Sequence, residues 1–209
     1  MQLFVGKNQL EGDIARYASR FNLLELRADA KNLPRGARLA DWKKRVPADF
    51  AFSIVLPRAL GLFESSSIEL GRTLELADAL SAQWLLLQTP SSVGPSARMR
   101  DRLSKFFEAV AHETRRIAWE SRGVWEDPQI EEFAAEHGVH VVRDVSMSAP
   151  PDGEVVYTRL LALGEGVQVR ASAAEHVAAL LADREEALVV IEGHGAEHAA
   201  KLLRQELMS

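Results

Sequence analysis

Acidic and basic side chains stand near the ends of several short apolar runs, where they could build one polar pocket. Glu25, Glu120 and Asp144 are carboxylates that could exchange a proton with a substrate. Arg122 and Arg159 could bind an anion, because a guanidinium offers a planar fork of N–H donors to a carboxylate or a phosphate. We therefore expect a pocket for a small anionic molecule. An enzymatic role, as a hydrolase or lyase that uses paired carboxylates, is left open.

Further residues accompany these groups and are predicted to bind the same molecule. They are Arg27, Arg58, Gln88, Trp125, Tyr157, Gly193 and Gly195. A charge that faces a protein interior is costly unless it is paired, so the acidic and basic groups should pair with each other, with a ligand, or with both. A network of ion pairs that satisfies itself without a ligand is the alternative interpretation.

The elements that would position these residues alternate between short apolar runs and longer segments of helical period. The predicted strands are Leu3–Val5, Leu23–Leu26, Ala51–Leu56, Trp84–Gln88, Arg116–Trp119, Val139–Val142, Val155–Leu161 and Ala187–Ile191. The predicted helices are Leu10–Arg20, Leu39–Arg45, Ser67–Ser81, Ala97–His112, Pro128–His137, Ala171–Asp183 and Ala196–Leu207. Such alternation is typical of βα units, and eight strands are the number that a (β/α)8 barrel needs. The segment Val145–Gly153 has no helical period, so the sixth unit is expected to be irregular.

The position of polar residues within the strands favours a closed barrel over an open doubly wound sheet. In the second predicted strand Leu23 is followed on the same face by Glu25 and Arg27, and later strands repeat this order. A barrel produces this pattern where its packed interior gives way to a polar mouth at the carboxyl ends of its strands. No linker divides the chain. We predict a single α/β domain over residues 1–209, with TIM-barrel-like (β/α)8 architecture.

Composition and charge restrict the partners. The chain has 209 residues with 25 Lys+Arg against 30 Asp+Glu, a net charge of −5, which argues against a nucleic-acid partner. It has no Cys, which excludes disulfides, a zinc ribbon and a cysteine nucleophile. No segment approaches the roughly 20 apolar residues of a membrane span, so no membrane partner and a cytoplasmic location are expected. The sequence leaves the oligomeric state open.

Several features of the sequence suggest further sites, and plainer interpretations stand beside them. Gly193-His194-Gly195-Ala196 follows a strand and opens a helix, which fits either a phosphate-binding loop or a tight turn. The inverted zinc-protease pattern from His194 to His198 is rejected, because Gly195 weakens the helix start. No cofactor is expected.

A divalent metal held by Glu25, Glu120, Asp144 and Glu192 is a weaker hypothesis, because the neighbouring arginines would compete for the carboxylates. The four Trp residues are expected to pack in the core, with Trp125 as the exception beside Arg122.

Several motifs together resemble the YecE-like proteins, the domain-of-unknown-function family 72. The matching stretches are Val5-Gly6, Arg20 to Leu26, Trp42 with Pro47, Phe50, Phe52, Pro57 and Arg58, Leu87 to Pro90, Glu120 and Arg122 with Trp125, Asp144, and Tyr157 to Leu160. The resemblance covers nearly the whole chain and implies a barrel related to the (β/α)8 fold. It implies no particular reaction, because the family has none assigned.

The chain also departs from this resemblance at positions of the expected pocket. The first loop is shortened to Gly6-Lys7-Asn8, where the family usually has a longer glycine-containing segment. The other departures are Val55 for Lys, Gly61-Leu62 for Thr-His, Leu161 for His, and Glu192-Gly193 for an Asn pair. Chemistry that depends on those family residues is not expected here. A non-catalytic, degenerate barrel that serves as a ligand-binding or protein-interaction module is therefore the alternative function.

Overall fold

Eight parallel strands define the fold of the computed structural model, which describes residues 1–30, 33, 36–64, 67–161, 171–193 and 195–208. The strands are β1 (Gln2–Lys7), β2 (Leu23–Arg27), β3 (Ala51–Val55), β4 (Trp84–Thr89), β5 (Arg116–Ser121), β6 (His140–Arg143), β7 (Val155–Leu160) and β8 (Glu186–Ile191). They follow one another in sequence order, and β1 pairs in parallel with β8. This closed order excludes the open sheet and confirms the predicted (β/α)8 fold class.

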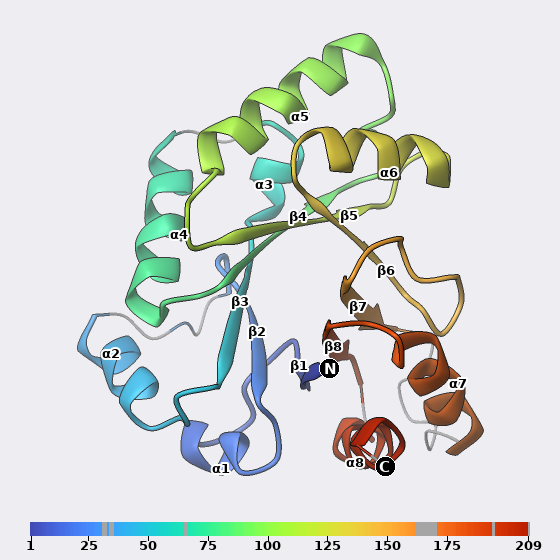
Figure 1. The fold of residues 1–209 in the computed structure, drawn as a ribbon. Coiled ribbons are helices and arrows are strands. Elements are labelled where there is room, and N and C mark those ends of the chain that lie inside the picture. Colours follow the sequence, from blue (N-terminus) through green and yellow to red (C-terminus); the bar gives the residue numbers. More distant parts are fainter. Residues whose placement is uncertain (31–32, 34–35, 65–66, 162–170, 194, 209) are drawn as a thin grey trace. The chain divides into compact units, whose positions relative to one another are not determined.

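Helices separate the strands at most of the expected places (Figure 1). They are α1 (Ile14–Ala18), α2 (Ala37–Lys44), α3 (Arg58–Gly61), α4 (Ser67–Leu80), α5 (Ala97–Val110), α6 (Asp127–Glu136), α7 (Ala171–Leu181) and α8 (Ala196–Met208). The short α3 was not expected, and α1 is shorter than its predicted range. Residues 144–154, which join β6 to β7, contain no helix, which confirms the irregular sixth unit.

The chain groups into two compact units, and each is described by itself. Unit 1 contains Met1–Glu25, Arg45–Ala51 and Val142–Ser209. Unit 2 contains Leu26–Lys44 and Phe52–Val141. The single domain expected over residues 1–209 stays a prediction. Among the described residues, no helix has the length and apolar character that a membrane crossing requires.

In unit 1, a buried tyrosine connects α1 to the first two strands. The Tyr17 hydroxyl donates to the backbone oxygen of Leu23 at 2.7 Å and accepts from the backbone N–H of Lys7 at 2.7 Å. Burial raises the pKa of the Tyr17 phenol, so it stays protonated and keeps its donor role. Tyr17 thus holds the last residue of β1 against the start of β2. In the same unit, α8 packs beside β1 and beside α7.

In unit 2, an aromatic cluster packs α5 and α6 against β5 (Figure 1). Trp119 contacts Phe107 and Phe133 with ring centroids 5.9 and 6.0 Å apart, and it contacts Trp125 at 5.1 Å. Trp125 is 7% exposed, and its Nε1 donates to the backbone oxygen of Val93 at 2.8 Å. The structure therefore places Trp125 in the core together with Trp119, as in the packing interpretation, and not as an exposed stacking surface beside Arg122.

Glycine 6 marks the tightest approach between two strands of unit 1. A Cβ atom at Gly6 would lie 1.8 Å from the backbone oxygen of Leu23, and backbone cannot move aside cheaply. We expect Gly6→Ala to lower the free energy of unfolding by about 2 to 3 kcal/mol, measured by urea denaturation.

Gly71 offers the matched control, because it lies within α4 and a Cβ there would meet nothing within 4 Å. Gly71→Ala should raise the free energy of unfolding by up to about 1 kcal/mol, through helix propensity. Equal effects of the two substitutions would contradict the close approach at Gly6.

Candidate functional site

The most buried ionic group of unit 1 lies at the ends of β2, β7 and β8, and we call it the Glu25–Arg159 cluster. It consists of Glu25, Tyr157, Arg159 and Glu192. Oε2 of Glu25 accepts from the Tyr157 hydroxyl at 2.7 Å. Oε1 accepts from Nε and Nη2 of Arg159 at 3.2 and 3.0 Å. Arg159 also donates to Oε1 of Glu192, directly after β8.

Burial decides what this cluster can do. The side chain of Glu25 is 0% exposed and that of Arg159 is 5% exposed, so water screens neither charge. Tyr157 and Arg159 are two residues apart on β7, which puts both on the face that Glu25 approaches. Both oxygens of Glu25 are already engaged by the protein. Glu25 and Arg159 thus form a buried ion pair in which both carboxylate oxygens accept hydrogen bonds. Removing either charge would leave the other one buried and unpaired.

Unit 2 carries a second polar group at the ends of β2, β4 and β5, which we call the Arg27–Arg122 chain. Nη1 of Arg27 donates to Oε1 of Gln88 at 2.9 Å, and Nε2 of Gln88 donates to Oε2 of Glu120 at 2.5 Å. Nε and Nη2 of Arg122 lie 3.1 and 3.0 Å from Oε1 of Glu120. Four side chains at the carboxyl ends of three strands thus form one continuous hydrogen-bonded row.

Exposure changes along the Arg27–Arg122 chain. Glu120 in its middle is 11% exposed, whereas Arg122 at its end is 55% exposed. Arg27 at the other end is also half-exposed, and it forms a bidentate pair with Asp29 at 3.1 and 3.3 Å. The two guanidinium groups therefore reach solvent, while the carboxylate between them is sheltered.

Arg58 and Gly61 lie on α3, next to the same chain. The backbone N–H of Arg58 donates to Oδ2 of Asp29 at 3.5 Å, so the helix begins beside the Arg27–Asp29 pair. A Cβ atom at Gly61 would lie 2.0 Å from the backbone oxygen of Gln88. A threonine at position 61, as in the family pattern, does not fit this backbone arrangement. Glycine here lets α3 reach the end of β4.

Asp144 organises a loop of unit 1. Its Oδ1 accepts from the backbone N–H and the hydroxyl of Ser146 at 2.9 and 2.5 Å. Its Oδ2 accepts from the backbone N–H of Leu161 at 2.8 Å. Both carboxylate oxygens therefore accept hydrogen bonds from backbone N–H groups, one in the β6–β7 connection and the other directly after β7. The catalytic role expected for Asp144 stays a prediction.

The glycine-containing loop after β8 borders a small cavity in unit 1. Gly193 and Gly195 have φ angles of 94° and 85°, in the region that favours glycine. His194, which belongs to the rejected zinc pattern, lies outside the described residues. The cavity measures about 160 Å³ and is lined by Lys7, Glu11, Tyr17, Arg20, Phe21, Gly195, Ala196 and Glu197. The sequence analysis did not single out Lys7 or Arg20 as site residues. A lysine in a shortened loop at the carboxyl end of a strand was a signal for Lys7.

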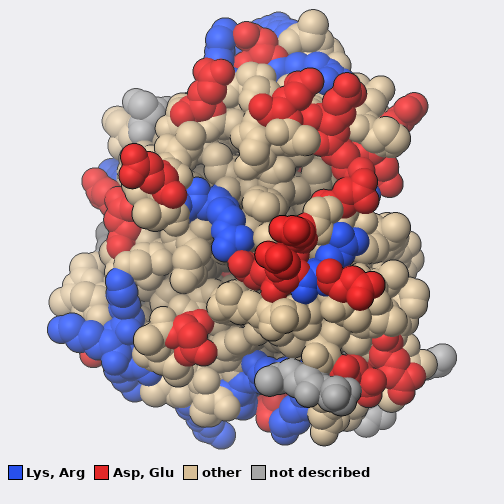
Figure 2. Space-filling view, in the orientation of Figure 1, with Lys and Arg blue, Asp and Glu red and all other residues tan. Residues whose placement is uncertain are grey.

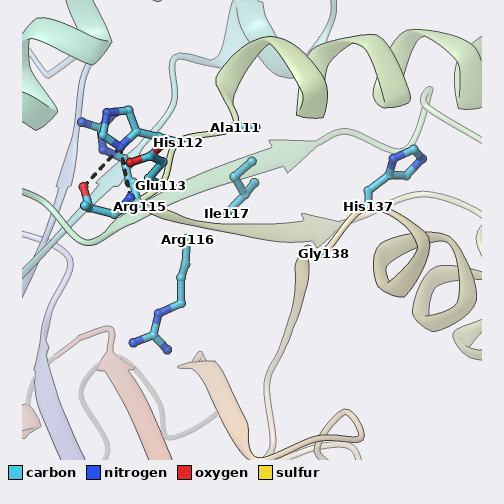
Figure 3. A pocket seen from close by; sticks show the side chains of 9 residues that line it. Ala111, His112, Glu113, Arg115, Arg116, Ile117, His137 and Gly138 are labelled. Carbon is cyan, nitrogen blue, oxygen red and sulfur yellow. Dashed lines mark hydrogen bonds between the residues drawn. The ribbon is translucent and has the colours of Figure 1, made fainter.

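A larger hollow of about 330 Å³ lies in unit 2, where α5 ends and β5 begins (Figure 3). Its charged groups do not point to a common centre, since Arg116 and His137 extend in different directions from the group around His112 (Figure 3). Arg115 pairs with Asp78, the Arg116 guanidinium lies 4.7 Å from the Trp84 ring centroid, and His137 contacts Ser104 at 2.9 Å. These contacts serve packing, so we place no site there.

The structure joins the predicted residues in two separate groups. Glu25, Tyr157 and Arg159 meet in unit 1, while Arg27, Gln88, Glu120 and Arg122 meet in unit 2. One shared mouth for both groups stays a prediction, because they belong to different compact units. Within the described part of the chain, no three His, Asp or Glu side chains lie where they could hold a metal ion together.

The closed strand order and the polar groups at the strand ends define a parallel (β/α)8 barrel protein. The family described as "Protein of unknown function DUF72" matches residues 6–208, and the chain belongs to this family, as the resemblance implied. A comparison with curated proteins finds no match.

Solved structures show the same fold at low sequence identity. A DUF72 family protein from Enterococcus faecalis V583 is 19% identical with a TM-score of 0.74, and the match covers 100% of this chain and 98% of that one. A DUF72 family protein from Thermotoga maritima MSB8 is 16% identical with a TM-score of 0.74 over 100% of both chains. An L-ribulose 3-epimerase is 13% identical with a TM-score of 0.59, over 98% of this chain and 91% of that one. These likenesses concern the fold.

The Glu25–Arg159 cluster generates a stability prediction. Arg159→Met leaves Glu25 buried beside an apolar side chain, so we expect a loss of about 3 to 5 kcal/mol in the free energy of unfolding. Arg27→Met, which breaks a half-exposed pair, should cost less than about 1 kcal/mol. Urea denaturation of both variants provides the comparison.

A double variant tests the coupling. Glu25→Leu combined with Arg159→Met should cost less than the sum of the two single substitutions, because each single one strands a buried charge. Strict additivity of the three measured losses would count against a coupled buried pair.

Proposed function

We propose that this protein binds a small anionic molecule, bearing a carboxylate or a phosphate, at the Arg27–Arg122 chain, and that Glu120 exchanges a proton with it. One observation carries the proposal: a sheltered carboxylate stands in a hydrogen-bonded row between two half-exposed arginines at the carboxyl ends of β2, β4 and β5. In barrels of this kind the carboxyl ends of the strands carry the active sites.

The arginines are suited to bind because both guanidinium groups reach solvent. A half-exposed ion pair such as Arg27–Asp29 contributes only about 0 to 1 kcal/mol, since water and salt screen it, so Arg27 can turn to an incoming anion at small cost. Arg122 is 55% exposed and can meet the same anion while it stays beside Glu120. A guanidinium would then offer two parallel N–H donors to the anionic group.

Gln88 connects Arg27 to Glu120, because it accepts a hydrogen bond from one and donates to the other. Its amide oxygen accepts from Arg27, so its amide nitrogen is left to donate to Glu120. This bond and the contact with Arg122 keep the Glu120 carboxylate in one orientation. A sheltered carboxylate held in one orientation is suited to exchange a proton with a bound molecule. We assign Gln88 a positioning role.

Glu25 takes a different part in this proposal. With no exposed surface and with both oxygens engaged by Tyr157 and Arg159, it is suited to hold strand ends in place. The proton exchange is therefore assigned to Glu120, which sequence reasoning had paired with Glu25 as an equal partner.

The surface charge supports a local site for a small molecule. Acidic side chains lie among the basic ones on the face shown in Figure 2, in keeping with the net charge of −5. A nucleic acid requires an extended basic surface, whereas a small anion requires only two or three donors at one place.

Thermal unfolding with a panel of ligands tests the proposal. The panel contains sugar acids, phosphorylated metabolites, nucleotides and divalent ions. A ligand present at about 100 times its Kd should raise the Tm by roughly 5 to 10 °C. We expect such a rise with an anionic compound and its loss in Arg122→Ala, because the guanidinium that binds the anion is removed.

Two further variants separate binding from folding and from chemistry. Arg98→Ala removes an exposed arginine of α5 and should keep the full Tm rise. Glu120→Gln should keep the rise, yet abolish turnover of any compound that the wild type converts. With a sugar acid that carries no phosphate, a rise that survives Arg122→Ala would refute the site, and no rise with any compound would favour the non-catalytic barrel.

A further inference from the structure

The cavity of unit 1 that Lys7 and Arg20 line has the features of a phosphate site. Its volume of about 160 Å³ is close to that of five water molecules at about 30 Å³ each, which is enough for the five heavy atoms of a phosphate group. Lys7 ends β1, Arg20 follows α1, and Gly195 and Ala196 open α8. Three separate elements thus place N–H donors around one small space.

The two cations are less exposed than their present partners. The Lys7 side chain is only 11% exposed, but Glu11, which accepts from its Nζ at 2.5 Å, is 58% exposed. Arg20 is likewise less exposed than Glu197, with which it pairs at 3.1 Å. The ammonium and guanidinium groups lower the pKa values of the Glu11 and Glu197 carboxyls, respectively, so both carboxylates are ionised at neutral pH. Each surface carboxylate lies where an anionic ligand would otherwise lie.

The cations also retain unused donors. An ammonium has three N–H groups, and among the described residues only Glu11 accepts from Lys7. The Nε–H of Arg20 is buried and finds no acceptor in the described part of the chain. A buried donor without an acceptor costs free energy, and a small shift of the guanidinium towards an anion would recover it.

The start of α8 adds backbone donors at the same place. The N–H of Ala199 donates to the backbone oxygen of Gly195 at 3.0 Å, so the N–H groups of residues 196–198 precede the first bond within this 13-residue helix. Such N–H groups and the positive end of the helix dipole favour an anion. Glycine at position 195, with its φ of 85°, allows the chain to turn into the helix without a side chain over the cavity.

We propose that this cavity binds a phosphate group, either inorganic phosphate or the phosphate end of a small monoester, through Lys7, Arg20 and the start of α8. Binding displaces Glu11 and Glu197 into solvent, which costs little because exposed pairs are weak. The site lies in unit 1 and does not depend on the role proposed for Glu120 in unit 2.

Calorimetric titration of the whole chain with inorganic phosphate at neutral pH tests this proposal. Lys7→Gln and Arg20→Gln should each weaken phosphate binding by about ten- to a hundredfold, because each removes a charged donor. Glu11→Gln should tighten binding by up to about fivefold, because it removes the competing carboxylate. This opposite sign keeps the test decisive even where Lys7→Gln fails to fold.

Lys201 provides the matched control. It pairs with Glu197 at 3.2 Å, as Arg20 does, yet it is exposed and does not line the cavity. Lys201→Gln should therefore leave phosphate binding within about twofold of the wild type. Arg122→Ala should also keep the part of the binding that depends on Lys7, which separates a failure here from a failure at the Arg27–Arg122 chain.

A second titration with glycerol phosphate distinguishes the two sources of the phosphate group. Tighter binding of the monoester supports a substrate-derived phosphate, and binding of inorganic phosphate alone supports the free ion. The proposal is overturned if phosphate does not bind, if Lys7→Gln and Arg20→Gln bind it as well as the wild type, or if Glu11→Gln weakens it.

Discussion

The Glu25 carboxylate has no exposed surface, and its need for hydrogen-bond partners constrains how the strand ends of unit 1 are arranged. An ionised group in such surroundings needs partners on both oxygens, and Tyr157 and Arg159 supply them from alternate positions of β7. This works only in one register, in which Tyr157 lies opposite Leu188 and Arg159 opposite Val190 on β8. A slip by one residue would turn both partners to the opposite face, so the polar cluster and the pairing of β7 with β8 depend on each other.

The same residue types serve a different purpose in unit 2 because the solvent reaches them. In the Glu25–Arg159 cluster the charges stabilise one another, and moving one of them would leave its partner buried and unpaired. In the Arg27–Arg122 chain the end groups are half-exposed, so solvent screens their charges, and the anion site that we propose uses this exposure. Exposure, rather than the identity of the residues, therefore separates a cluster suited to hold strands from the row that we propose as an anion site.

The sequence predicted much of the fold, since apolar runs and the polar residues that follow them on one face are local signals. All eight strands lie within a few residues of their predicted ranges. The alternation also put Glu25, Tyr157 and Arg159 on one face, where the structure joins them. Roles that depend on tertiary contacts escaped prediction. Trp125 packs in the core against Trp119 and Phe133 and donates to a carbonyl oxygen 32 residues away. Lys7 lines a cavity together with the start of a helix at the far end of the chain.

Some residues that depart from the family pattern contact the polar groups at the strand ends. Gly61 brings α3 against the carbonyl oxygen of Gln88, Leu161 donates its N–H to Asp144, and Glu192 accepts from Arg159. These three replacements thus each take part in a contact with a residue of the predicted site. The contact of Leu161 uses its backbone N–H and would survive any side chain, whereas those of Gly61 and Glu192 depend on the residue present. The proposed anion site requires strand ends that are ordered in this way.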